Sequence, residues 1–300
     1  MERVRQAEKR VLGLRALLVC NAALLALWWF TSSLSHHPRP EQDVVALGPL
    51  PSATDTRHGG DKVAIIIETT MVPNLIPVML HFAQVLGPSW NMVLFTDADS
   101  WTMPDSAGFL RLLDSGQLRI AFLPLGADLR SHYGVSVFLT RPWLWQQLQT
   151  AHRVLVFQVD SMLCTASNQT VDDFLQYDLV GAPIAPDFGA GFNGGLSLRN
   201  PALMLAVATA TATTDEDDFF GDAPRPGLSP FEDQWFYARL KDRGAHLPDE
   251  AVAKTFAVET VWYDRPLGFH QPFRFHPDKA DQITAWCPEV GMMMAGRLAG

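Results

Sequence analysis

The stretch RVLVFQVDSMLC, residues 153–164, holds the most apolar run in the part of the chain that we expect to fold as a globular domain. Its β-branched and large apolar side chains predict a buried strand. Asp160 breaks this pattern, and an unpaired charge is rarely found inside a buried strand. We therefore expect the carboxylate at the C-terminal end of the strand, the edge at which open α/β sheets bind ligands.

Three further apolar strands precede this stretch, and helical patterns separate them. The strands are predicted at 62–67, 91–96 and 117–123, and the helices at 74–86, 106–114 and 139–150. Strands that alternate with helices predict an α/β fold, with a mostly parallel sheet flanked by helices on both faces. Such a sheet would bring Glu68, Asp97, Asp99 and Asp160 to one edge.

The N-terminal region predicts a membrane anchor. Residues 16–34 carry no charge over 19 positions, about the length that spans a bilayer. Residues 1–15 carry a net charge of +3, which favours a cytosolic tail and a type II orientation. Residues 35–61 hold four prolines and predict a stem. A cleaved signal peptide is the alternative for the apolar segment.

Beyond the stem we expect a luminal domain over residues 62–279 and a C-terminal tail over residues 280–300. The whole chain has a net charge of −9, so residues 16–300 carry −12 once the +3 of the cytosolic tail is set aside. Nucleic acid binding draws on clustered Lys and Arg, and no basic stripe follows residue 35. These observations argue against a nucleic acid partner.

The cysteines and one sequon are informative about the cellular compartment in which the domain folds. Cys20 lies in the predicted membrane span, which leaves Cys164 and Cys287 as a pair that could form a disulfide, unless Cys164, which follows a core strand, is simply a buried thiol. Asn168-Gln169-Thr170 is an N-glycosylation sequon in a predicted loop, which fits a luminal domain.

The glycine-rich stretch GAGFNGGLSLRN, residues 189–200, is not a phosphate loop. It lacks the GKS or GKT ending and leads into a strand, whereas a dinucleotide fingerprint opens a helix. We expect the glycines to allow close backbone approach, either to a ligand or to a neighbouring strand. A predicted helix over 201–210 follows, and then an acidic, Pro- and Gly-rich loop over 211–229.

The stretch SPFEDQWFYARLKDRG, residues 229–244, predicts a capped helix. Ser229 matches the N-cap, Pro230 the first turn and Glu232 the third position of a capping box. Asp233 fits the helix dipole equally well. Alternatively, two adjacent acids after a glycine-rich approach can present a general base to a hydroxyl group, and Asp233 is then the first candidate and Glu232 the second.

Five motifs occur in an order and spacing that resemble the GT-A-fold glycosyltransferases. They are VLVFQVDSMLC, YDLVGAPI, FNGGLSLRN, EDQWF and PLGFH. The resemblance runs from about Lys62 to Phe275, and it is most specific to a glycosyltransferase-like family with a Q-x-D-S core. It implies a GT-A-like, Rossmann-related fold, and type II anchoring on a Pro-rich stem is the usual build of such Golgi enzymes.

The resemblance also implies a donor site. Residues 158–161 match the Asp-x-Asp segment that binds ribose and, through a cation, the diphosphate of a nucleotide sugar. Asp160 would face the metal, Gln158 stands in place of the first acid, and Ser161 ends the segment. His270 would complete the metal or diphosphate site, or would simply pack against Phe269 and Phe273. A divalent cation, Mn²⁺ or Mg²⁺, is the expected cofactor, because such ions bind through few carboxylates and the substrate's phosphates.

Other positions follow from the same resemblance. Glu68 and Thr69 would meet the base and ribose, whereas the sugar and acceptor pocket would be lined by Asn193, Gly194 and Gly195. Trp235 would stack on a sugar ring or belong to the core. The expected partners are a nucleotide-sugar donor and a glycan, glycoprotein or glycolipid acceptor, and the expected location is the Golgi or ER membrane.

Two mechanisms and three other functions stay open at this point. An inverting transferase would use Asp233 as the base, whereas in a retaining enzyme Asp233 would only orient the acceptor. A catalytically inactive sugar or nucleotide-sugar binder would also fit the incomplete Asp-x-Asp motif. A glycosidase would use paired carboxylates but leaves the Q-x-D-S segment unexplained, and a purely structural protein leaves the strand-end acids unexplained.

Overall fold

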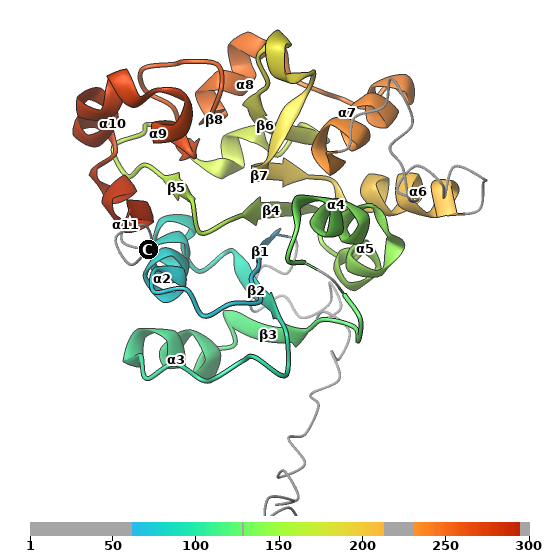
Figure 1. Cartoon of the computed structure of the whole chain (residues 1–300), viewed down its shortest axis with the longest axis vertical. Helices are drawn as coiled ribbons and strands as arrows, with labels where there is room; N and C mark the ends of the chain where they lie inside the picture. Colours follow the sequence, from blue (N-terminus) through green and yellow to red (C-terminus); the bar gives the residue numbers. More distant parts are fainter. Residues whose placement is uncertain (1–61, 128, 213–230, 295–300) are drawn as a thin grey trace, which may run out of the picture. The chain divides into compact units, whose positions relative to one another are not determined.

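The computed structural model describes residues 62–127, 129–212 and 231–294 (Figure 1). All of them belong to a compact unit that spans Leu47–Gly300. The predicted cytosolic tail, membrane span, stem and most of the acidic loop, with Ser229 and Pro230, lie outside the described residues. Within the described ranges, no helix has both the length and the apolar character needed to cross a bilayer.

A six-stranded central sheet confirms the α/β prediction (Figure 1). Its order is β3-β2-β1-β4-β7-β6. The strands are β1 Lys62–Ile67, β2 Asn91–Thr96, β3 Leu118–Phe122, β4 Arg153–Phe157, β6 Leu179–Pro183 and β7 Phe192–Arg199. The first four are parallel, and β7 is antiparallel to both β4 and β6. Five strands therefore run in one direction, and the sheet is mostly parallel, as predicted.

The stretch 153–164 forms two strands that belong to different sheets. After β4 the chain turns at residues 158–160 and enters β5, Ser161–Leu163, in a small sheet of order β5-β9-β8. The other members are β8 Ala257–Val258 and β9 Gly268–His270. The Ser161 hydroxyl accepts a hydrogen bond from the Gln158 N–H and donates one to the Gln158 carbonyl. Asp160 thus lies at the corner between the two sheets.

The helices cover both faces of the central sheet. Crossovers between parallel strands are right-handed, and the strand order moves one way from β1 to β3 and back again to β4. This places α2 Leu75–Leu86 and α3 Ala107–Asp114 on one face, with α4 His132–Thr140 and α5 Pro142–Leu148 on the other. Figure 1 shows the two pairs on opposite sides of the strands.

The single helix predicted over 139–150 is wrong, because the segment holds the end of α4 and a separate α5. Arg141 between them is extended, with φ −88° and ψ 152°. The residue before a proline avoids helical backbone, so Pro142 ends one helix and begins the next.

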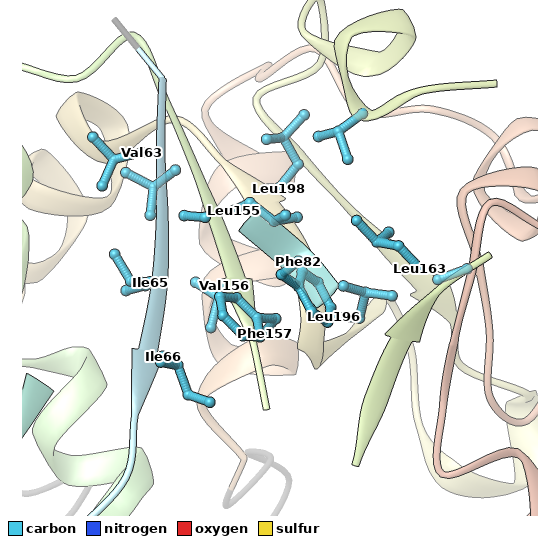
Figure 2. Close-up of a cluster of buried hydrophobic side chains, with 14 of the residues drawn as sticks. Val63, Ile65, Ile66, Phe82, Leu155, Val156, Phe157, Leu163, Leu196 and Leu198 are labelled. Atoms are coloured by element: carbon cyan, nitrogen blue, oxygen red, sulfur yellow. The ribbon is translucent and has the colours of Figure 1, made fainter. Parts of the chain in front are cut away.

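The core fills both faces of the central sheet, with Phe82 of α2 on one face and Trp145 of α5 on the other. Val63, Ile65 and Leu155 are fully buried. This agrees with apolar runs in strands that are covered on both faces. Phe82 of α2 stacks on Phe157 of β4 with ring centroids 4.0 Å apart. Figure 2 shows this pair beside Leu196 of β7. The burial anchors the end of β4 from which the candidate site emerges.

The second half of the domain adds further helices around β6, β7 and the small sheet. They are α6 Pro201–Ala212, α7 Glu232–Asp242, α8 Glu250–Phe256, α9 Pro272–Phe275, α10 Ala280–Trp286 and α11 Gly291–Met294, with 3₁₀ turns η1 Val171–Phe174, η2 Pro186–Phe188, η4 Pro277–Lys279 and η5 Pro288–Val290. Residues 280–294, which we expected to be a tail, pack on the domain. Ile283 and Val290 are buried, and α11 contacts α2 (Figure 1).

Cys164 and Cys287 form a disulfide, which resolves the alternatives left open by the sequence. The bond closes a long loop between β5 and the segment after α10. Closing a loop restricts the unfolded chain, so we expect Cys287→Ser to lower the free energy of unfolding by about 2–4 kcal/mol. Chemical denaturation of this variant, with Cys20→Ser as the control that keeps the bond, measures the effect. Equal unfolding midpoints for the two variants would contradict the expectation.

Candidate active site

A pocket of about 640 Å³ opens at the C-terminal ends of β1 and β4 and at the start of β7. Ten of the residues predicted for the site line it: Glu68, Thr69, Gln158, Asp160, Asn193, Gly194, Gly195, Glu232, Asp233 and His270. The antiparallel β7 explains the grouping, because its first residues meet the carboxyl end of β4. Asp97 and Asp99, which we expected at the same edge, are not among the described residues that line the pocket.

His270 stands at the centre of a buried polar cluster. Its Nδ1 lies 2.9 Å from Glu259 Oε1, and its Nε2 lies 3.2 Å from Gln158 Oε1 and 3.4 Å from Asp160 Oδ1. Burial alone would lower the pKa of His270, but the hydrogen bonds and charges of Asp160 and Glu259 raise it to about 9. The imidazole is therefore a cation held between two carboxylates at neutral pH.

Asp160 is also fixed from the other side, by Gln271. The Gln271 side-chain amide donates to Asp160 Oδ2 at 2.6 Å, and its backbone N–H donates to the Asp160 carbonyl. Burial favours the neutral acid, but the bonds from His270 and Gln271 outweigh it and lower the pKa of Asp160. Gln271 is the one non-glycine residue with positive φ in the described chain, at 44°. Such backbone strain occurs preferentially at functional sites.

Asp233 lines the pocket from the first turn of α7. Burial and the neighbouring Glu232 charge raise the pKa of Asp233 to about 7, although its carboxylate accepts hydrogen bonds from the N–H groups of Gln234 and Gly194. A carboxylate with a pKa near the working pH is the kind of group that can accept a proton during catalysis.

The capping-box assignment of Glu232 is wrong. Glu232 is the first residue of α7, not the third, and the N-cap position belongs to Phe231. Its carboxylate accepts two hydrogen bonds at 2.8 Å from the fully buried Arg199, and its N–H is bonded to the Ser136 hydroxyl. Because a buried carboxylate must be paired, Glu232 is committed to Arg199.

The two glycines of β7 make room for protein side chains. A Cβ on Gly195 would collide with the His270 ring, and a Cβ on Gly194 would collide with the carboxylate of Glu232 and the guanidinium of Arg199. The His270 ring belongs to β9, so Gly195 makes its close approach to a neighbouring strand, whereas Gly194 meets side chains of α7 and of β7 itself. Both glycines also line the pocket, but the space that they leave is already filled by His270 and Glu232.

The remaining predicted residues divide into two groups. Glu68 and Thr69 lie at the end of β1, and burial raises the pKa of Glu68. Asn193 donates to Glu259 and accepts from the Gly195 N–H. Ser161 and Trp235 are buried and are not among the described pocket-lining residues. Trp235 packs on Phe236 in the core, the second of the two roles considered for it.

Sequence reasoning missed Glu259 and Gln271. Neither belongs to a recognisable motif: Glu259 follows a two-residue strand, and Gln271 follows His270 directly. Glu259 holds His270 and Gln271 holds Asp160 through hydrogen bonds, and only the three-dimensional structure reveals these contacts.

The described residues contain no group of three His, Cys, Asp or Glu side chains able to hold a metal. Asp160 Oδ1 and Gln158 Oε1 nevertheless lie 3.4 Å and 3.2 Å from His270 Nε2, and with this nitrogen they make three donors of the types that Mn²⁺ accepts. This set fits a cation that completes its coordination with ligands from outside the protein, once His270 has lost its proton.

Three solved structures that resemble the chain are glycosyltransferases. GlyE of Streptococcus pneumoniae TIGR4 has 14% identity and a TM-score of 0.43 over 70% of this chain and 54% of its own. A glycosyltransferase involved in glycosylation of the major capsid of PBCV-1 has 11% identity and a TM-score of 0.43 over 75% and 99%. The mannosyltransferase PcManGT of Pyrobaculum calidifontis, solved with GDP-Man and Mn²⁺, has 13% identity and a TM-score of 0.38 over 76% and 63%.

The chain thus spans about half the length of GlyE. No curated protein matches the sequence. A family model described as "Protein of unknown function (DUF5672)" matches residues 117–270, slightly more than half of the chain. The matched range includes Asp160, Asp233 and His270, and the chain belongs to this family of proteins of unknown function, DUF5672.

Proposed function

We propose that the protein transfers a sugar from a nucleotide-sugar donor to a hydroxyl group of a glycan, glycoprotein or glycolipid. The observation that carries the proposal is the presence of two complementary polar groups in one pocket at the strand ends. One is Asp233, with a pKa of about 7, and the other is the cluster of Asp160 and His270. The five motifs that resemble GT-A enzymes support the same activity.

The donor side would lie between β1 and β9. Glu68 and Thr69 would contact the base and ribose, and Asp160 with Gln158 and His270 would face the diphosphate. A divalent cation held by Asp160 and His270 would supply positive charge for the departing diphosphate. Glu259 and Gln271 would keep these two side chains in place.

The acceptor side would lie at the first turn of α7. In an inverting transfer, Asp233 takes the proton of the acceptor hydroxyl, the new bond forms to the anomeric carbon, and the bond from that carbon to the diphosphate oxygen breaks. A carboxylate of pKa about 7 suits proton removal near neutral pH. In a retaining transfer the same contact would only orient the hydroxyl.

A thermal-shift screen tests the donor assignment. The full-length protein in detergent is heated with nucleoside diphosphates and their sugars, each with and without Mn²⁺. We expect one nucleotide to raise the melting temperature, and more strongly with the metal, because a ligand of the folded state stabilises it by mass action. Stabilisation without turnover would favour the inactive binder. No stabilisation by any nucleotide, in a folded sample, would overturn the proposal.

We also propose a Golgi or ER membrane location, with the domain in the lumen. The predicted span over residues 16–34 and the basic tail before it favour this orientation. The Cys164–Cys287 disulfide fits an oxidising compartment, and Asn168 of the sequon is exposed in a loop.

Glycosylation at Asn168 is a direct test of this topology. We expect peptide N-glycosidase to lower the apparent mass of the protein from secretory membranes, and Asn168→Gln to abolish that shift, because the sequence has no second sequon. Thr170→Ser keeps the sequon and is the matched control. A wild-type protein that never carries the glycan would contradict luminal exposure of this loop.

A further inference from the structure

An exposed aromatic pair lies at the pocket. Phe188 of η2 is 57% exposed, although it is a large apolar side chain. Its ring meets the half-buried Phe275 of α9 edge to face, with centroids 5.5 Å apart. Both residues line the pocket. Apolar side chains kept in water at the wall of a pocket indicate a binding surface.

The segment that carries Phe188 is held firmly against α7. The Phe188 carbonyl accepts a hydrogen bond from the Gln234 side chain at 3.1 Å. Gly189 follows in a positive-φ conformation, at 130°, and a Cβ there would collide with the same glutamine. These contacts fix the backbone of η2, so the exposure of Phe188 is a built feature and not the result of a loose loop end.

The position of the pair indicates which substrate it meets. Gln234, which anchors Phe188, follows Asp233, the carboxylate that we assign to the acceptor hydroxyl. Phe275 follows Gln271, which holds Asp160 on the donor side, by four residues. Phe188 is therefore tied to the turn of α7 that carries Asp233, and both rings line the same pocket as this carboxylate.

We propose that Phe188 and Phe275 form the acceptor subsite and that the acceptor is a saccharide whose pyranose ring stacks on them. A pyranose has an apolar face of C–H groups and a rim of hydroxyls, which matches an aromatic ring with polar neighbours. Arg274, which lines the pocket and whose guanidinium carbon lies 5.1 Å from the centroid of the Phe275 ring, provides such a neighbour. This inference rests on the proposed transferase function and names the chemical class of its acceptor.

The first test uses saturation-transfer NMR on the full-length protein with methyl hexopyranosides as probes, with UDP or GDP and Mn²⁺ present. We expect ring protons of at least one pyranoside to receive saturation from the wild type and to lose most of that signal with Phe188→Ala. Phe188→Trp should keep it. Tyr133→Ala, which removes a 42% exposed aromatic outside the pocket lining, is the matched control.

The second test uses any nucleotide sugar that proves to be a donor. We expect Phe188→Ala and Phe275→Ala to raise the acceptor KM about tenfold or more relative to the donor KM. Pyranoside binding that depends on Phe188, in a protein that turns over no donor, would uphold the subsite and overturn the transferase. Donor turnover with an unchanged acceptor KM in both variants, or tighter binding of alkyl chains than of pyranosides, would overturn the subsite.

Discussion

Asp160→Asn is expected to lower kcat/KM for nucleotide-sugar turnover by about 10²–10³-fold, close to complete loss in most assays. The substitution keeps the size of the side chain but removes the negative charge of Asp160 from the wall of the pocket, where we propose that the donor binds. It also removes the carboxylate that approaches His270 Nε2 at 3.4 Å. Initial rates with the donor identified by thermal shift measure the loss.

The same variant should fold almost normally. The Asp160 side chain is 37% exposed, and asparagine keeps an oxygen that can accept the hydrogen bonds from His270 and Gln271, so we expect only a small loss of stability. Asp97→Asn, at the end of β2 and outside the pocket lining, is the matched control and should keep both activity and melting temperature. Parallel losses of stability and activity in Asp160→Asn would show that the carboxylate is structural.

The strand ends could be predicted from the sequence because their pattern is local. Apolar runs closed by an acid placed Glu68 and Asp160 at one edge, and both line the pocket. The same reasoning predicted Asp97 at that edge. Asp97 does follow β2 directly, but it is not among the described residues that line the pocket. Periodicity identifies which strand a residue follows, whereas the side chains that cover a given strand end come from distant parts of the chain.

The parts that the sequence did not reveal depend on such distant contacts. Glu259 reaches His270 across β8 and β9, and Glu232 pairs with Arg199 across 33 positions of sequence. The capping-box pattern gave Glu232 a local partner, but burial beside a guanidinium provides a stronger one. The glycines of β7 were correctly read as sites of close approach, yet the approaching groups are side chains of the protein.

Asp233→Asn should slow transfer by about 10²–10⁴-fold while changing donor binding much less, if Asp233 removes the acceptor proton. The wild-type rate should rise with pH through about 7 and level off above it, because only the ionised carboxylate can act as a base. The variant should lack this rise. Asp242→Asn, exposed at the other end of α7, is the control and should keep the wild-type profile. Unchanged turnover in Asp233→Asn would remove the base assignment.

The pH dependence of stability is an independent test of the protonation of Asp233. The folded-state pKa of Asp233 is raised above the unfolded value, so the folded protein holds the proton more tightly and loses stability as pH rises toward 7. Asparagine does not titrate, and it removes the repulsion with Glu232 at the cost of one hydrogen-bond acceptor. The melting temperature of Asp233→Asn, relative to the wild type, should therefore improve between pH 5 and pH 8. A constant difference would mean that the folded-state pKa of Asp233 is not near 7, and a rise of the transfer rate through pH 7 would then have to come from another group.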